Sequence, residues 1–511
     1  MKNDQIVQKL WNLCDVLKDD GINYSDYVSE LVMLLFIKMV HETEETFTEH
    51  PLPEGCRWED LNSKSGINLL DHYRRILLIL STGKDGEKVI HNDPLLLAIY
   101  ANARTALNQP KHLEQLVRAL DEIDWFSARE DGLGDLYEGL LEKNVTETKS
   151  GAGQYFTPRP LINVMVRAIK PQPKELIQDP AAGTAGFLIA ADRYMKDQSD
   201  DYYDLDDNVR KFQEEKAFVG VELVANTRRL ALMNCLLHGM FGETEGVVLQ
   251  GNSLGDVGKN LPKADIILAN PPFGSSKGGD AAITRDDLPF DTSNKQLAFL
   301  QHIYRNLKTG GRAAVVLPDN VLFEAGKGTE IRRDLMEKCN LHTILRLPTG
   351  IFYAQGVKTN VLFFNKGSAS DPNQSEKCTD KVWVYDLRTN MPSFGKRTPF
   401  TEHYLAEFEK CFNPSNASTF NQDNLADILN ARNEGNWYLT EGEHTAENSR
   451  WRCFDRAYIA QEKGDSLDIS WLKDKNAVEA ENLPEPSDLA ALAKTELETA
   501  LAELDELLKA L

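Results

Sequence analysis

The feature that most limits the possible folds is an alternation of short β-rich runs with amphipathic helical stretches between residues 160 and 366. Runs rich in aliphatic and β-branched residues are followed in most cases by longer segments with apolar residues at helical spacing. This alternation predicts an α/β fold with a doubly wound sheet. A ligand crevice is then expected at the carboxyl ends of the strands. The expected strands are 176–178, 218–223, 247–250, 265–269, 313–317, 343–347 and 361–364.

The segments on either side of this region differ from it. Residues 1–146 carry apolar residues at three- and four-residue spacing without a series of strands, which predicts a helical N-terminal domain. Residues 476–511 carry leucines that step by four and three positions among many acidic residues, which predicts a terminal helix. This helix either packs on the core of its own chain or docks on another subunit.

Composition excludes several classes of protein. No apolar run approaches the roughly 20 residues that span a bilayer, and the N-terminus does not resemble a signal peptide. The seven cysteines are scattered without a CxxC pair, which argues for a reducing cytoplasm and against a disulfide framework or a zinc site. The formal net charge is −22, and basic side chains supply most non-specific affinity for nucleic acid. The chain would therefore need a local basic cleft, or a basic partner, to bind DNA.

A turn of small residues follows the first expected strand, within "LIQDPAAGTAGFLIAA" (176–191). The strand ends at Asp179, and a helix is expected to begin near Thr184–Gly186. Gly183 and Gly186 allow the backbone to approach a ligand closely. The stretch is neither a dinucleotide fingerprint nor a Walker loop. It predicts a ligand of adenosine type that carries an amino acid rather than phosphates, although a simple strand-to-helix turn is the alternative.

Two later strand ends offer further contacts to such a ligand. Glu222 lies near the end of the second expected strand, where a carboxylate can accept hydrogen bonds from both hydroxyls of a ribose. Its distance in sequence from the glycine turn exceeds the usual figure of about 20 residues. The polar segment 196–216, expected as a surface excursion, explains the excess. Alone, Glu222 could be a solvated residue at the rim. Asn252, after the third strand, is a candidate for contact with adenine.

The fourth expected strand ends in Asn270, Pro271, Pro272 and Phe273. The prolines restrict the backbone and remove two N–H donors, which leaves the Asn270 side-chain carbonyl and the Pro271 backbone carbonyl as acceptors. Two acceptors directed at an exocyclic amino group bind its hydrogens and turn its lone pair toward an electrophilic methyl group. Phe273 offers a face on which a flipped base can stack. An accidental turn is the alternative.

In this order, these motifs resemble those of amino-methyltransferases that use S-adenosylmethionine. More narrowly, the whole chain resembles the modification (methyltransferase) subunit of a type I restriction–modification system. The resemblance implies a Rossmann-like methyltransferase catalytic domain at residues 147–475 and a C-terminal helical tail for subunit docking at 476–511. The matching sequences are "GQYFTPRPL" (153–161), "DPAAGTAGFL" (179–188), Glu222, "NPPF" (270–273), "LPDNVLF" (317–323) and "GVKTNVLFF" (356–364).

The resemblance also implies roles for the matching residues. Residues 270–273 would bind the target adenine and position its amino nitrogen, Thr157 would lie near the carboxylate of the cofactor, and Glu222 would hold its ribose. Ala185 stands where many such enzymes have glycine; alanine costs about 1 kcal/mol if the position needs a positive φ and is otherwise harmless, which is the interpretation adopted from the sequence. The predicted cofactor-binding residues are Gln154, Tyr155, Phe156, Thr157, Pro158, Arg159, Asp179, Gly183, Thr184, Ala185, Gly186, Glu222 and Asn252.

The implied function is N6-adenine methylation of DNA in the cytoplasm, with S-adenosylmethionine as the methyl donor. Subunits of this family work as a pair on one specificity subunit, which reads the DNA sequence, and a restriction subunit can join them. The acidic chain would thus obtain its affinity for DNA from a partner. One alternative is a methyltransferase that acts on a protein glutamine or an RNA base. Another is a non-catalytic scaffold subunit. Methylation of cytosine N4 is disfavoured because Asn270, rather than Ser or Asp, leads the motif.

Overall fold

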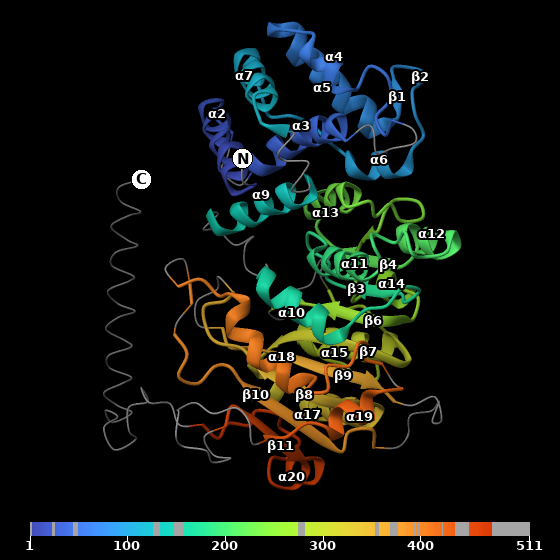
Figure 1. Cartoon of the computed structure of the whole chain (residues 1–511). Coiled ribbons are helices and arrows are strands. Elements are labelled where there is room, and N and C mark those ends of the chain that lie inside the picture. Colours follow the sequence, from blue (N-terminus) through green and yellow to red (C-terminus); the bar gives the residue numbers. More distant parts are fainter. Residues whose placement is uncertain are drawn as a thin grey trace, which may run out of the picture.

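The described residues form an N-terminal helical part and an α/β part (Figure 1). The computed structural model describes residues 3–22, 26–43, 50–125, 133–147, 157–273, 282–352, 357–367, 377–392, 394–395, 398–421, 423–434 and 449–472. The predicted tail at 476–511 and the predicted site residues Gln154, Tyr155 and Phe156 lie outside these ranges. The three domain boundaries remain predictions.

The N-terminal helical part is built around α3 (Tyr27–Glu42), of whose 16 residues 13 are buried. Its apolar residues occur on all sides of the helix, so neighbouring helices surround it. The charge of its buried Lys38 is balanced by Glu42 and Asp121. A short hairpin, β1 (Lys84–Asp85) and β2 (Lys88–Val89), was not predicted from the sequence. The other helices are α1 (Asn3–Asn12), α2 (Cys14–Asp19), α4 (Trp58–Asn62), α5 (Gly66–Thr82), α6 (Pro94–Ile99), α7 (Pro110–Asp121) and α9 (Leu133–Glu147).

The α/β part contains a nine-stranded sheet in the order β11-β10-β8-β9-β7-β6-β3-β4-β5. All seven expected strands are present in it. Strands β5, β4, β3, β6 and β7 are parallel, whereas β9 runs antiparallel between β7 and β8. The strands are β3 (Ile177–Asp179), β4 (Phe218–Glu222), β5 (Val248–Gln250), β6 (Ala264–Ala269), β7 (Leu307–Pro318), β8 (Cys339–Arg346), β9 (Thr359–Lys366), β10 (Lys381–Asp386) and β11 (Trp451–Asp455).

The sheet is covered by helices on both faces, as a doubly wound fold requires. Residues of β6 separate by alternation into two hydrophobic clusters, because successive side chains of a strand point to opposite faces. Ile266 and Leu268 belong to the cluster that includes α10 (Arg159–Ile169), α11 (Gly186–Gln198) and α13 (Ala225–Leu237). Ile267 and Ala269 belong to the cluster that includes α15 (Lys295–Asn306) and α17 (Lys327–Lys338). The remaining helices are α12 (Asp207–Glu215), α14 (Asp256–Lys259), α16 (Asp319–Phe323), η5 (Glu402–Leu405), α18 (Ala406–Phe412), α19 (Leu425–Asn430) and α20 (Arg456–Gln461).

The polar segment 196–216 is more than a surface excursion. It includes α12, and its Tyr202 and Gln213 side chains are buried. The hydroxyl of Tyr202 donates to the Asp192 carboxylate at 2.8 Å. The many acidic residues of this segment had predicted an exposed excursion, so the burial of Tyr202 and Gln213 was not expected. Within the described residues, no helix combines the length and apolar character that crossing a membrane would require.

The order of connections creates a crevice at one edge of the sheet. From β3 the chain proceeds outward to β4 and β5, then returns to the opposite side of β3 to form β6 and β7. Neighbouring connections therefore diverge between β3 and β6, and ligands of open α/β sheets bind at such switch points. Asp179 and Glu222 end β3 and β4, and Asn270 directly follows β6.

Candidate active site

A cavity of about 350 Å³ opens at this switch point. Its wall combines the turn after β3 with the carboxyl ends of β4, β5 and β6. Apolar side chains such as Leu254 and Phe299 lie beside polar groups from the predicted set. A volume of this size is in the range of small-molecule sites. The predicted site residues in its wall are Gly183, Thr184, Glu222, Asn252, Asn270 and Pro272.

The turn after β3 adopts left-handed backbone at two positions. Gly183 has φ +55° and Ala185 has φ +68°. Ala185 directly precedes α11 and is completely buried. The prediction that alanine is harmless at Ala185 is therefore wrong, because left-handed backbone costs a residue with a Cβ atom about 1 kcal/mol. Packing of the whole turn holds this conformation, which no local pattern in the sequence revealed.

Glu222 ties the turn to the end of β4. Its carboxylate accepts hydrogen bonds from the backbone N–H groups of Gly183 (3.0 Å) and Val224 (2.8 Å). Burial raises the pKa of Glu222, and the backbone N–H groups oppose this rise. The carboxylate therefore has fixed orientation in the cavity wall, and each oxygen retains further capacity as an acceptor.

The end of β5 is held by side chains on both sides. Asn252 accepts a hydrogen bond from the Leu254 N–H (2.9 Å) and donates to the Ala282 carbonyl (2.6 Å). The hydroxyl of the buried Ser253 donates to the Pro180 carbonyl at 2.5 Å. These contacts join the residues that follow β5 to the turn after β3 and to Ala282. Asn252 thus lies in the cavity wall, held by its own hydrogen bonds, and its contact with adenine stays a prediction.

Asn270 is buried, with 7 % of its surface exposed, and lies in the cavity wall. Its side-chain Nδ2 donates to Thr157 Oγ1 at 3.0 Å. Because the amide nitrogen faces Thr157, the amide carbonyl faces a different direction. Both residues also line a second, smaller cavity of about 60 Å³, together with Asp179 and Gly186. The sequence motifs assign Thr157 and Asn270 to one site, but they do not predict this contact between the two side chains.

The rest of the 270–273 motif is fixed by neighbours. The Pro272 carbonyl accepts a hydrogen bond from Gln296 Nε2 at 2.9 Å, and Gln296 itself is buried at the start of α15. Phe273 packs edge-on against Phe352, with ring centroids 6.3 Å apart. Gln296 was not predicted as a site residue, because it belongs to none of the sequence motifs. Its burial and its contact with Pro272 arise from tertiary packing.

Asp179 is 1 % exposed at the end of β3. Its carboxylate accepts a hydrogen bond from the Ala181 N–H at 2.9 Å. Burial raises the pKa of Asp179 to about 7, and the charge of Glu222 acts in the same direction. The residue therefore stabilises the turn from within and titrates near neutral pH.

Two predicted residues next to Thr157 begin helix α10. Pro158 is the residue before the first helical position, which Arg159 occupies. The guanidinium of Arg159 forms an ion pair with Glu138 of α9. From the sequence, Arg159 was predicted to bind the cofactor, and Glu138 had no predicted role. The two residues lie in different predicted domains, so no sequence pattern indicated their ion pair.

The comparisons with known proteins first identify the class. The family model described as N-6 DNA Methylase matches residues 128–447, and the model described as HsdM N-terminal domain matches residues 6–120. The first model alone spans the whole parallel part of the sheet and every described residue of the site.

The more similar relatives narrow the family. The chain is 55% identical to the type I restriction enzyme StySPI methylase subunit of Salmonella potsdam and 54% identical to the EcoKI methylase subunit of Escherichia coli K12. Both alignments cover 100% of this chain and 96% of the relative. The chain belongs to the methylase subunits of type I restriction enzymes, within the N-6 DNA methylase family.

Solved structures agree with this assignment. The crystal structure of the EcoKI M protein superposes with a TM-score of 0.59 at 50% identity, over 99% of this chain and 96% of that protein. A chain from a type I restriction–modification system, solved in a study of complex assembly and conformational transition, gives a TM-score of 0.69 at 25% identity. That superposition covers 100% of this chain and 99% of the other.

Proposed function

We propose that this chain transfers a methyl group from S-adenosylmethionine to the N6 amino group of adenine in DNA, with sequence specificity supplied by a separate specificity subunit. The observation that carries the proposal is the position of Asn270. Its buried amide lies in the wall of the same cavity as Glu222 and the turn at Gly183 and Thr184. An acceptor for an amino group therefore adjoins a site with the chemistry of an adenosine pocket.

The shape and lining of the cavity support S-adenosylmethionine as the methyl donor. Its volume of about 350 Å³ and its apolar side chains suit a planar adenine, while Glu222 offers oriented carboxylate oxygens to the two ribose hydroxyls. Thr157 and Asp179 line the adjoining small cavity, where the methionine end of the cofactor would lie. When bound, S-adenosylmethionine supplies an electrophilic methyl group.

The residues 270–273 supply positioning rather than a strong base. The Asn270 side-chain carbonyl and the Pro271 carbonyl accept the two hydrogens of the adenine amino group, which holds its nitrogen lone pair toward the methyl group. The nitrogen–carbon bond forms as the carbon–sulfur bond breaks, and the amino group then releases one proton to solvent. Thr157 holds the Asn270 amide, and Gln296 holds the carbonyl of Pro272, the residue after Pro271.

The proposed partners are DNA, one specificity subunit, a second copy of this chain and, in the full complex, a restriction subunit. The net charge of −22 supports DNA binding through a partner subunit, because the chain itself has little overall attraction for DNA phosphates. Residues 1–146 are proposed as a helical domain, 147–475 as the catalytic domain and 476–511 as the docking tail.

The test is methyl transfer by an Asn270→Ala variant in complex with the specificity subunit. With labelled S-adenosylmethionine and DNA, we expect label on adenine with the wild-type chain and a loss of at least about a hundredfold with the variant, since positioning effects reach this size. Asn260→Ala serves as the control, because Asn260 is an exposed asparagine whose side chain donates to the Asp256 carbonyl and does not line the cavity. Full activity of Asn270→Ala would contradict the catalytic assignment.

A further inference from the structure

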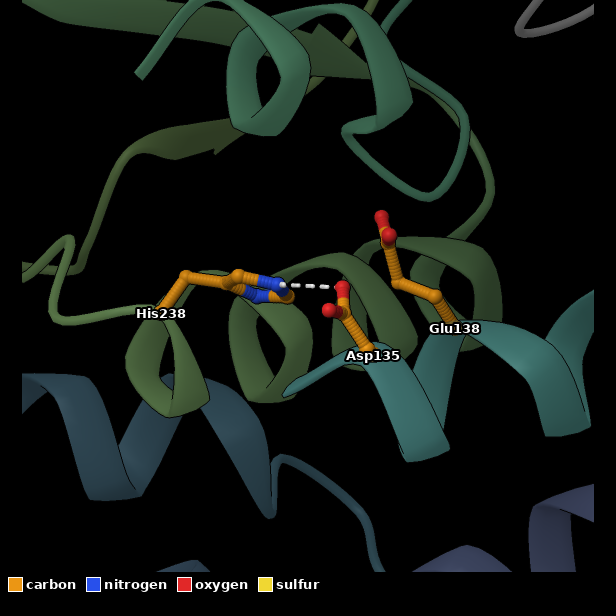
Figure 2. A group of neighbouring side chains, drawn as sticks. All are labelled: Asp135, Glu138 and His238. Carbon is orange, nitrogen blue, oxygen red and sulfur yellow. Dashed lines mark ion pairs between the residues drawn. The ribbon is translucent and has the colours of Figure 1, made fainter. Parts of the chain in front are cut away.

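Helix α9 of the N-terminal helical part meets the catalytic part beside the site. Asp135 and Glu138 come from α9, and His238 lies at the end of α13 (Figure 2). One ligand atom from each of the three lies within 4.8 Å of the others, which is the spacing of a metal site. Two guanidinium groups already neutralise these carboxylates, however: Arg193 pairs with Asp135, and Arg159 with Glu138. The group is an ion-pair network between two parts of the chain.

Glu138 is the buried member of this network. Its side chain is 6 % exposed, whereas that of Asp135 is 43 % exposed. Figure 2 shows the Glu138 carboxylate directed away from the Asp135–His238 pair. Besides Arg159, the carboxylate lies 3.6 Å from Arg193 Nη2 and accepts a hydrogen bond from Asn234 Nδ2 at 3.4 Å. A buried carboxylate with three partners has one strongly preferred position.

Asn234 extends the network to the cofactor turn. This residue of α13 is completely buried, and its Nδ2 also donates to the Thr184 carbonyl at 3.0 Å. Thr184 lines both cavities and directly precedes Ala185, whose left-handed backbone is strained. Glu138 and Thr184 therefore share one amide donor. Asn234 thus holds the Thr184 carbonyl, and Glu138 of α9 in turn orients the Asn234 amide.

Arg159 extends the network in a second direction. It is the first residue of α10, two positions after Thr157, which accepts the hydrogen bond from Asn270. The ion pair with Glu138 thus anchors the start of α10 close to the side chain that orients Asn270. The Glu138 carboxylate therefore contacts both Asn234, which holds the turn at Thr184, and Arg159, which lies beside Thr157.

We propose that Glu138 and Asn234 are positioning residues for methyl transfer, and that α9 completes the site from outside the α/β part. Glu138 orients Asn234, which holds the cofactor turn, and Arg159, which holds the segment that carries Thr157. The inference rests on the proposed function, because it assigns these residues to the binding of S-adenosylmethionine and to the placement of Asn270. Neither Glu138 nor Asn234 lies in the wall of either cavity, so both are assigned an indirect role.

The first test measures the affinity of the full chain for S-adenosylmethionine by calorimetry. Glu138→Gln keeps the shape of the side chain but removes its charge, and Asn234→Ala removes the donor to Thr184. We expect each to raise Kd by about tenfold, the effect of losing roughly one buried hydrogen bond. Asp135→Asn is the matched control: it removes a carboxylate from the same helix, paired with Arg193, and should leave Kd within about twofold.

The second test separates the two branches of the network. In complex with the specificity subunit, Asn234→Ala should act mainly on the KM for S-adenosylmethionine, because only the turn is affected. Glu138→Gln should lower kcat by about tenfold as well, because the support of Arg159 is lost too. Thermal unfolding of each variant reports on folding separately.

The outcomes distinguish the inference from the function on which it rests. Unchanged Kd in both Glu138→Gln and Asn234→Ala, with a lowered unfolding midpoint, would mean a purely structural network and would overturn the inference. Wild-type chain that fails to bind S-adenosylmethionine, with or without the specificity subunit and DNA, would overturn the proposed function instead. If Asp135→Asn raised the Kd for S-adenosylmethionine as much as Glu138→Gln does, the effect would come from the packing of α9 in general. That result would contradict the specific role of Glu138.

Discussion

At the scale of single residues, Thr157 decides which way the Asn270 amide faces. The hydroxyl of Thr157 accepts the Asn270 N–H, and 113 positions separate the two residues in sequence. Valine has nearly the shape of threonine but no acceptor. We therefore expect Thr157→Val to lower kcat for methyl transfer by roughly tenfold, the equivalent of about 1.4 kcal/mol. Thr157→Ser, which keeps the hydroxyl, should retain most of the activity, and a wild-type rate in Thr157→Val would refute this role.

Asp179 gives a prediction about pH and stability. Its pKa is raised to about 7 in the folded chain by burial, against about 3.9 for an ordinary aspartate. The folded chain therefore holds a proton that the unfolded chain releases, and this stabilisation is present at low pH and is lost as pH rises from about 4 to about 7. Asp179→Asn does not titrate and can still accept the Ala181 N–H.

The measurement is the urea midpoint of Asp179→Asn minus that of the wild-type chain. This difference should increase from pH 5 to pH 8, because only the wild-type chain acquires a buried charge over that range. An equal difference at both pH values would mean that Asp179 is already ionised at pH 5. Asp207→Asn, which changes a side chain that is 91% exposed, is the control and should show no such trend.

At the scale of elements, the approach of α9 to α13 depends on Gly134. A Cβ atom at Gly134 would lie 2.5 Å from two atoms of the His238 ring, closer than any real contact. The ring cannot easily move, because its Nδ1 lies at hydrogen-bond distance (2.8 Å) from the Asn234 carbonyl. Replacing glycine by alanine usually stabilises a helix by up to about 1 kcal/mol. Here we expect Gly134→Ala to lower the unfolding midpoint.

His238→Ala provides the control for this contact. The double variant Gly134→Ala, His238→Ala has room for the added methyl group and should be more stable than the sum of the two single changes predicts. Additive effects in thermal unfolding would show that the two residues do not compete for space. Loss of cofactor affinity in Gly134→Ala, regained in the double variant, would further link the α9–α13 contact to the site.

At the scale of the whole molecule, charge predicts dependence on a partner. With a net charge of −22, the chain alone should transfer label from S-adenosylmethionine to DNA at a rate near background. Addition of the specificity subunit should restore transfer to adenine, and raising the salt concentration should weaken DNA binding by the complex. Efficient, site-specific methyl transfer by the isolated chain would contradict the proposal that a separate specificity subunit recognises the DNA sequence.

The tail at 476–511, which lies outside the described residues, belongs to the same question. Its leucine spacing left two alternatives, a helix on its own core or one docked on another subunit. A chain that ends at residue 475 should bind S-adenosylmethionine like the full chain but lose affinity for the specificity subunit, if the second alternative is right. Loss of cofactor binding would favour the first.

The sequence by itself determined the α/β class, seven of the strands and the grouping of several candidate site residues in one cavity wall. These depend on local patterns: alternation of apolar runs, small residues in a turn after β3, and two prolines that follow Asn270 at the end of β6. Strand ends in a doubly wound sheet meet at one edge, so Asp179, Glu222 and Asn270 could be grouped before their distances were known. Periodicity and proline stereochemistry act within a few residues, which is why a linear sequence reveals them.

Only the tertiary structure decided how that site is held. The left-handed backbone at Ala185, the hydrogen bond from Asn270 to Thr157 and the ion pair between Arg159 and Glu138 all depend on packing between distant segments. Orientation of a buried amide or carboxylate depends on every donor and acceptor around it, and these come from α9, α10 and α13 together. Local patterns predict which groups reach the edge of the sheet, whereas long-range packing determines the direction in which each group points.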